Sequence, residues 1–327
     1  MYTLVGGFLA VSYTDLVQGL MMVAALIAVP VIGVIHLGGI GATVDAVTAV
    51  DPHYWAVLGP TTSVISVISS LGWGLGYFGQ PHIIVRFMAL RTPEDAKAGR
   101  RIGMSWMVLT VVGSISTAFV GVAYFATHPE VSLTDKESAE TVFLDLAQIL
   151  FHPFIAGMIL AAVLLAIMST LSSQLVVCSS ALVEDLYGVF VKKKLSSNQS
   201  LWLGRAGVAI VAVIATLMAL DKNNSILSLV EFAWAGFGSA FGPIVILSLY
   251  WRKLTLPGAV SGMVVGAVVT FFWRQVFNLT ETIDVYEMIP GFFLAFLVTV
   301  VVSLATYEKN EEIEQEFDKA AELAKAG

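Results

Sequence analysis

The stretch of sequence that decides the fold is residues 63–86, SVISVISSLGWGLGYFGQPHIIVR. It is apolar and long enough to cross a bilayer, because a hydrocarbon core about 30 Å thick needs roughly 20 helical residues. Pro81 has no N–H to offer the carbonyl of Tyr77, and several nearby glycines let the backbone leave helical geometry: Gly72, Gly74, Gly76 and Gly79. Freed carbonyls are tolerated in hydrocarbon only where they meet protein or line a cavity. These residues therefore predict a discontinuous helix.

One face of the same stretch is unusually polar for a membrane helix. Hydroxyl and aromatic residues recur there every three to four positions, at Ser63, Ser66, Ser70, Trp73 and Tyr77. Such a face next to a helix break is typical of a site that holds a small solute near the middle of the membrane. The alternative is a kinked packing helix, since glycine is common where membrane helices touch.

The composition agrees with a membrane protein. Apolar residues make up 57% of the 327 residues and charged residues only 13%, against about one quarter charged in soluble domains. Ten of the charges lie in residues 308–327, which we expect to form a short amphipathic helix. The single cysteine, Cys178, excludes an internal disulfide, and no basic block or finger motif indicates nucleic acid.

Eight stretches are long and apolar enough to span a bilayer, at about 16–37, 64–87, 102–126, 155–181, 201–220, 226–250, 258–273 and 288–307. Residues 1–11 are also apolar, but eleven helical residues reach only about 17 Å. We expect this first segment to end near Asp15, either as an interfacial stub or as the closing half of a helix that begins before this chain does.

Orientation follows from the cationic loops, which stay in the cytoplasm. One set of alternate connections carries ten cations: Arg86, Arg91, Lys97, Arg100, Arg101, Lys192, Lys193, Lys194, Arg252 and Lys253. The opposite set carries three: Lys136, Lys222 and Arg274. The first set is therefore predicted to be cytoplasmic, and with it the C-terminal tail.

A second cluster of interest lies in the stretch 155–187. Ala166, Ser169 and Thr170 stand at i, i+3 and i+4, so a backbone carbonyl and two hydroxyls can converge on one point of the helix surface. Neutral oxygens of this kind suit a hard monovalent cation better than a transition metal. The alternative is that the hydroxyls bond to the preceding turn or hold two helices together.

Other polar features point to no reaction. Glu231 is the one carboxylate well inside an expected span, and it is either functional or placed at the outer interface. The stretch 233–239, AWAGFGS, is suited to bending or close packing. Five histidines lie far apart with no ligand spacing, and Cys178 has no base nearby in sequence, so we expect no enzyme activity: His36, His53, His82, His128 and His152.

Several motifs together resemble the bacterial sodium/proline symporters of the sodium:solute symporter family. They are WGLGYFGQPH at 73–82 with RFM at 86–88, MSTLS at 168–172 with CSSAL at 178–182, the pattern from Ser248 to Lys253 with Gly258, Gly262 and Gly266, and YTLVGGFLA at 2–10. The resemblance extends to about residue 307.

The resemblance implies an all-α, polytopic membrane helix bundle of the LeuT type, two inverted repeats of five helices. This chain would supply the second repeat, about 16–250, and two later helices, but lack most of the first repeat. Residues 1–307 would form the transporter domain and 308–327 a charged cytoplasmic tail. The location would be the bacterial cytoplasmic (inner) membrane.

The implied activity is sodium-coupled uptake of L-proline by alternating access. Sodium ligands would be the Ala166 carbonyl and the Ser169 and Thr170 hydroxyls, while Trp73 and Tyr77 would line the proline pocket and Gln80 and Pro81 would shape it. The partners would be L-proline, sodium and the lipid bilayer, with no obligate protein partner indicated.

Three alternatives remain open at this point. A related transporter could carry pantothenate or a short organic acid, a symporter-like membrane domain could sense a solute, or the chain could insert without transporting.

Overall fold

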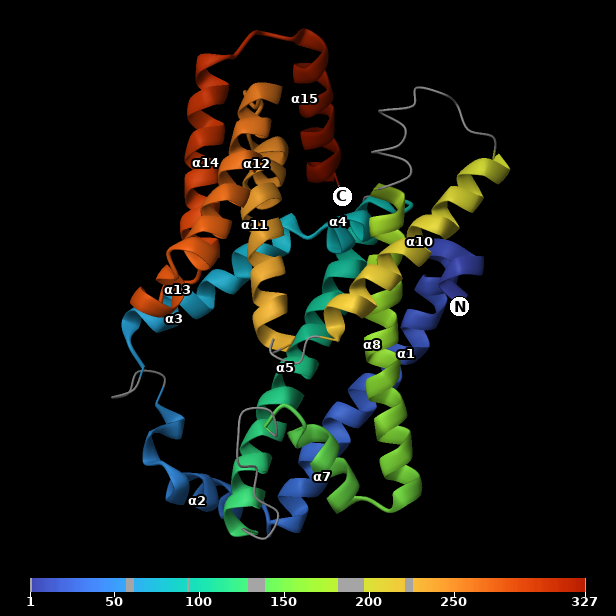
Figure 1. Ribbon diagram of the computed structural model, residues 1–327, viewed down its shortest axis with the longest axis vertical. Coiled ribbons are helices and arrows are strands. Elements are labelled where there is room, and N and C mark those ends of the chain that lie inside the picture. Colours follow the sequence, from blue (N-terminus) through green and yellow to red (C-terminus); the bar gives the residue numbers. More distant parts are fainter. Residues whose placement is uncertain are drawn as a thin grey trace. The chain divides into compact units, whose positions relative to one another are not determined.

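The computed structural model describes residues 2–56, 62–92, 94–128, 139–181, 197–220 and 226–326, and these residues form helices and connections without a β-strand (Figure 1). The long helices are α1 (Tyr2–His36), α5 (Asp95–Thr127), α8 (Pro153–Ser180), α10 (Ser197–Ala219), α11 (Ile226–Tyr250), α12 (Leu256–Phe271) and α14 (Met288–Ala305). The shorter ones are α2 (Ile40–Val50), α3 (Val64–Gly72), α4 (Pro81–Met88), α7 (Val142–Leu150), α13 (Leu279–Ile283) and α15 (Glu311–Ala326). Two segments, η1 (Pro52–Trp55) and η2 (Trp73–Gly79), are 3₁₀ helices, and η5 (Phe272–Val276) is a short π-helix.

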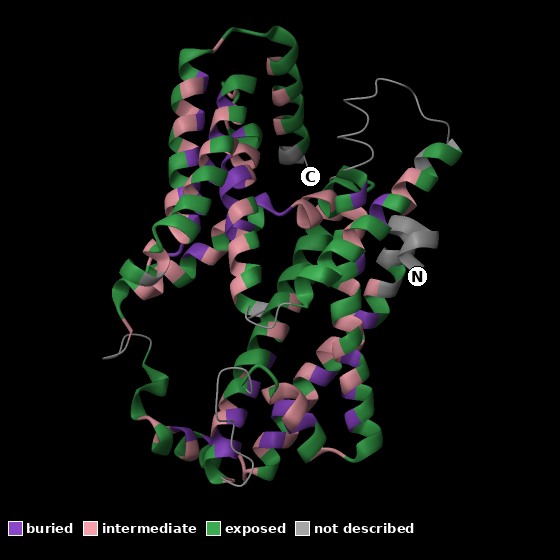
Figure 2. Ribbon diagram, in the orientation of Figure 1, coloured by how far each residue is buried: buried purple, intermediate pink, exposed green. Residues whose placement is uncertain are grey.

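Seven helices in the described residues are long and apolar enough to cross a membrane. They match seven of the eight expected spans, and the eighth, 64–87, is divided among α3, η2 and α4. Exposed residues run along the outer faces of the long helices (Figure 2). Many of these are large and apolar, such as Leu164 at 61% and Leu217 at 63% exposed. Faces of this kind are stable against lipid, so the chain is a multi-pass membrane protein.

The chain divides into two compact units. Unit 1 consists of Met1–Ala56 and Arg101–Lys222, and unit 2 of Val57–Arg100 and Asn223–Gly327. Each unit is therefore built from two separate parts of the chain, and each holds one of the two clusters that the sequence singles out.

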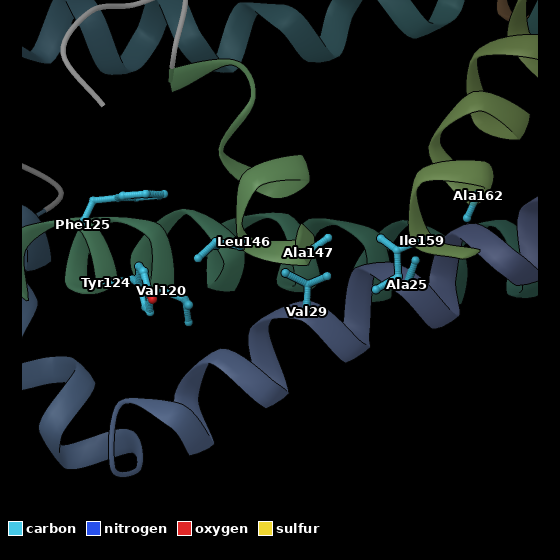
Figure 3. Close-up of a cluster of buried hydrophobic side chains, with 9 residues drawn as sticks. All are labelled: Ala25, Val29, Val120, Tyr124, Phe125, Leu146, Ala147, Ile159 and Ala162. Atoms are coloured by element: carbon cyan, nitrogen blue, oxygen red, sulfur yellow. The ribbon is translucent and has the colours of Figure 1, made fainter. Parts of the chain in front are cut away.

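Unit 1 has its core where α1, α5, α7 and α8 meet (Figure 3). Val29 of α1, Val120 of α5 and Leu146 of α7 are at most 1% exposed. Ile159 and Ala162 of α8 complete the cluster from the other side. Apolar side chains from four helices thus fix the relative positions of α1 and α8, the two helices that carry the polar residues described below.

Unit 2 is held by small residues. Gly258, Gly262 and Gly266 recur along α12 at intervals of four. Gly258 and Gly262 lie against Thr299 and Ser303 of α14, and Gly266 lies against the backbone of Ser239 in α11. A Cβ atom on Gly258 would lie 2.9 Å from the backbone oxygen of Thr299, so a larger residue would push the helices apart. Close approach of this kind is a main source of helix association in membranes.

The first helix corrects one expectation. Residues 2–36 form a single helix, whereas a separate segment ending near Asp15 was predicted. The residues around the expected break, Ser12 to Asp15, include no glycine or proline, so nothing interrupts the hydrogen bonds of the helix there.

The C-terminal residues form the expected helix, α15, and it docks within unit 2. The guanidinium of Arg252 pairs with the carboxylate of Asp318 and lies 5.9 Å from the ring centre of Phe317. The Tyr307 hydroxyl donates to Glu314 at 2.5 Å, and this hydrogen bond raises the pKa of the phenol. Polar contacts therefore attach the tail close to the ends of α11 and α14.

Candidate functional site

The discontinuous helix is confirmed in unit 2. The α-helix α3 ends at Gly72 and continues as a 3₁₀ helix, η2, to Gly79. Gln80 is extended, with φ −82° and ψ 115°, and Pro81 then opens α4 at its first turn, where a missing N–H costs nothing. The backbone is therefore interrupted at Gln80, while the glycines of the segment also pack closely against α11, as the alternative supposed.

The broken segment lies on α11, around the indole of Trp234. The rings of Trp73 and Trp234 stack with centres 5.7 Å apart, and Tyr77 meets Trp234 edge-on at 5.0 Å. The indole N–H of Trp234 donates to the backbone oxygen of Trp73 at 3.0 Å. This bond satisfies one carbonyl that the irregular backbone exposes, which is the requirement for breaking a helix inside a membrane.

Gln80, at the C-terminal end of η2, also holds the broken segment against α11. Its side chain is 3% exposed, and its amide donates to the backbone oxygen of Trp234 at 3.1 Å. Two glycines make the approach possible, since a Cβ on Gly76 would overlap the indole of Trp234 and one on Gly79 would lie 2.8 Å from the Cα of Gly238. Glycine is needed here for close contact between two backbones.

The four residues expected to form the solute pocket therefore differ in their surroundings. Tyr77 is 41% exposed and Trp73 is half-buried, so both offer ring surface near the break. Gln80 is buried and its amide holds α11, while Pro81 is half-buried at the start of α4. The sequence analysis did not identify Trp234 as their common partner. The only local indication was that this tryptophan lies within the glycine-rich stretch 233–239.

The oxygen cluster lies in unit 1, on α8. The Thr170 hydroxyl donates to the Ala166 carbonyl at a long 3.4 Å, which is the back-bonding geometry of a helical threonine. The Ser169 hydroxyl instead donates to the carboxylate of Asp15 on α1, at 2.5 Å. Both contacts are those of the alternative interpretation, since Thr170 bonds to the preceding turn and Ser169 joins α8 to α1. The sodium site remains a prediction, and the structure adds a carboxylate, Asp15, that the sequence analysis did not single out.

A second residue of α1 faces the same way as Asp15. Gln18, one turn later, is 5% exposed, and its side-chain oxygen has no hydrogen-bond partner. The Asp15 carboxylate, the Ser169 and Thr170 hydroxyls and the Ala166 carbonyl are oxygen groups, the ligands that a hard cation prefers. Among the described residues, no group of three or more His, Cys, Asp or Glu side chains could hold a metal ion.

Glu231 of α11 is paired. Its carboxylate lies 3.8 Å from the guanidinium of Arg274, and its side chain is 34% exposed. This ion pair offsets the charge of the carboxylate near the start of α11.

The fold and these two clusters define a class of protein. The chain belongs to the sodium:solute symporter family, whose model matches residues 1–266. The chain also superimposes on a Na⁺-coupled sialic acid symporter in a substrate-bound, outward-open state, with a TM-score of 0.74 and 19% identity, covering 94% of this chain and 65% of the other. The expected LeuT-type fold class is confirmed.

Several bacterial proline transporters are more similar to this chain in sequence than the sialic acid symporter is. The osmoregulated proline transporter OpuE of Bacillus subtilis is 50% identical over 306 residues, covering 94% of this chain and 61% of the relative. The high-affinity proline transporter PutP of the same organism is 48% identical over 317 residues, covering 97% and 65%. The sodium/proline symporter of Escherichia coli is 44% identical over 320 residues, covering 98% and 63%. The chain thus spans somewhat under two thirds of the length of these relatives.

Proposed function

We propose that this chain carries the solute-binding and sodium-binding helices of a sodium-coupled L-proline transporter that works by alternating access. The observation that carries the proposal is the broken segment α3–η2–α4, whose rings of Trp73 and Tyr77 meet at Trp234. The names of relatives 44–50% identical support proline as the solute.

Sodium binding is assigned to α8. Because the Ser169 hydroxyl gives its hydrogen to Asp15, the lone pairs of its oxygen remain for a cation. The 3.4 Å contact from Thr170 to Ala166 is weak, so a cation between the two oxygens replaces it at little cost. The carboxylate of Asp15 supplies the negative charge that makes this place favourable for a cation.

Proline binding is assigned to the rings of Trp73 and Tyr77. The apolar pyrrolidine ring suits an aromatic wall, and its secondary ammonium is attracted to the face of such rings. Gln80 and Pro81 shape the pocket indirectly: the buried amide of Gln80 fastens η2 to α11, and Pro81 starts α4 in a new direction.

Inward sodium movement drives the cycle. Each sodium ion yields about 2.3 kcal/mol per 100 mV of membrane potential, in addition to its concentration gradient. Sodium on α8 favours the outward-open state, proline then closes the site, and low cytoplasmic sodium releases both inward.

The surroundings follow from the loop charges. We place the chain in the bacterial cytoplasmic membrane, with the loops that carry Arg86 to Arg101, Lys192 to Lys194 and Arg252 to Lys253 in the cytoplasm. Residues 1–307 form the transporter domain in this proposal, and the charged tail 308–327 lies on the cytoplasmic side.

An uptake assay tests the proposal. The matching segment of the Bacillus subtilis transporter OpuE is replaced by this chain, and the chimera is expressed in cells that lack proline uptake. We expect uptake of labelled proline in sodium medium, little in potassium medium, and no competition by excess pantothenate or a short organic acid. A correctly inserted chimera that takes up proline equally in both media, or not at all, would overturn the proposal.

A further inference from the structure

The turn between α13 and α14 holds two buried residues that the proposed transport cycle does not use. Tyr286 is 7% exposed and Glu287 is fully buried, although both precede the membrane helix α14. The turn is strained, since Asp284 has a left-handed backbone with φ 56°. Strain of this kind persists only where the surrounding contacts impose it.

Tyr286 contacts three other elements of unit 2. Its ring stacks on that of Trp73 in η2, with centres 5.9 Å apart and planes 15° from parallel. Its hydroxyl donates to the backbone oxygen of Glu231 in α11 at 2.7 Å. Its backbone N–H donates to the Ser69 hydroxyl of α3 at 2.6 Å. One residue therefore ties the broken helix to α11 just before the break.

Glu287 anchors the turn that carries Tyr286. Its two carboxylate oxygens accept from Arg274 at 2.7 Å and from Thr280 at 2.8 Å. The other arm of the Arg274 guanidinium donates to Ser228 of α11 at 2.7 Å. A buried carboxylate is tolerated only when it is paired and hydrogen-bonded in this way, so the turn has little freedom to move.

Trp73 is thus fixed by two aromatic neighbours at once, Tyr286 and Trp234. We propose that Tyr286 is a positioning residue for the solute site: it holds the indole of Trp73 and the start of η2 in the geometry that binds solute, and the Arg274–Glu287 pair holds Tyr286. This inference rests on the proposed function only in naming the solute. The contacts by which Tyr286 holds Trp73, called the Tyr286 clamp below, all lie within unit 2 and do not depend on the identity of the solute.

The first test measures motion without transport. A nitroxide label is attached to Gly74→Cys, where a side chain meets open space, in the purified full chain with Cys178→Ser in lipid nanodiscs. Tyr286→Leu removes ring stacking and the phenol bond, and we expect the label to become clearly more mobile. Tyr286→Phe keeps the ring and should remain close to the parent. Tyr250→Leu is the matched control, because Tyr250 is 81% exposed in the same unit. Unchanged mobility of the label in Tyr286→Leu would overturn the proposal that Tyr286 holds Trp73 and the start of η2.

The second test measures binding against turnover in the OpuE chimera. Tyr286→Leu should raise the KM for proline roughly fivefold or more and change the maximal rate by less than about twofold. Tyr286→Phe keeps the ring, so its KM should be close to that of the parent. Loss of maximal rate alone, at unchanged KM, contradicts a positioning role. If the chimera does not transport, the proposed function fails, while the label still decides the clamp independently.

Discussion

The hydroxyl of Ser169 on α8 donates a hydrogen bond of 2.5 Å to the carboxylate of Asp15 on α1. The two residues are 154 positions apart in the chain, and both helices are fixed by the core of unit 1 (Figure 3). Because the serine is the donor, its oxygen keeps its lone pairs, and the proposed sodium site has a charged neighbour. The sodium dependence of proline binding is therefore expected to respond to both residues.

Removing the hydroxyls of the oxygen cluster should weaken sodium binding. In the OpuE chimera, Ser169→Ala and Thr170→Ala are each expected to raise the sodium concentration for half-maximal proline uptake roughly tenfold, because one ligand is lost. Thr216→Ala is the matched control, since Thr216 is an exposed helical threonine that bonds back to Ala212. Unchanged sodium dependence in both cluster variants would remove the sodium assignment.

The charge of Asp15 should matter separately from its hydrogen bond. Asp15→Asn can still accept from Ser169 but has no negative charge, so we expect a higher sodium requirement with a smaller effect on proline affinity at saturating sodium. The exposed residue Asp45 provides the control, Asp45→Asn. Binding of labelled proline, measured as a function of sodium concentration, gives the sodium requirement of each variant. Equal sodium requirements for Asp15→Asn and the parent would speak against the role of the carboxylate.

The indole N–H of Trp234 should stabilise the break. Trp234→Phe keeps an aromatic ring but leaves the carbonyl of Trp73 without its donor, which costs about 1 kcal/mol or more in a nonpolar environment. Thermal unfolding of the purified chain should show a lower midpoint for this variant than for Trp202→Phe, where the ring is 66% exposed. A midpoint equal to that of the control would show that the bond contributes nothing.

Glycine should be required at two positions of η2 and dispensable at a third. Gly76→Ala and Gly79→Ala place a methyl group against Trp234 and against the backbone of α11, and overpacking of this kind typically costs about 1–3 kcal/mol. Gly74→Ala meets open space and should be tolerated. Folded yield and thermal midpoint measure the difference, and equal behaviour of the three variants would contradict the packing of η2 on α11.

Much of this architecture follows from local sequence. Seven spans and the break at Gly79–Pro81 could be predicted because apolar length, glycine and proline act on their own neighbourhood. The partners of the broken segment could not be predicted, because Trp234 and Tyr286 lie 161 and 213 positions after Trp73. A helical sequence pattern predicts a helix but not the other helix against which it packs.

Three further features had weak local signals. The short helices α2, α7 and α13 are below the length that a membrane pattern requires, and the continuity of α1 through Asp15 has no positive sequence mark. Asp15 itself was visible only as a single carboxylate among apolar residues; its importance comes from Ser169, which no spacing rule connects to it.

Coupling of proline movement to sodium is the core of the proposed function. The most direct measurement reconstitutes the OpuE chimera in proteoliposomes and imposes an inward sodium gradient with equal proline on both sides. We expect proline to accumulate inside above its external concentration and a potassium gradient to give no accumulation. The double variant Ser169→Ala with Thr170→Ala should abolish accumulation at low sodium. Proline that only equilibrates, whatever the sodium gradient, would contradict sodium coupling.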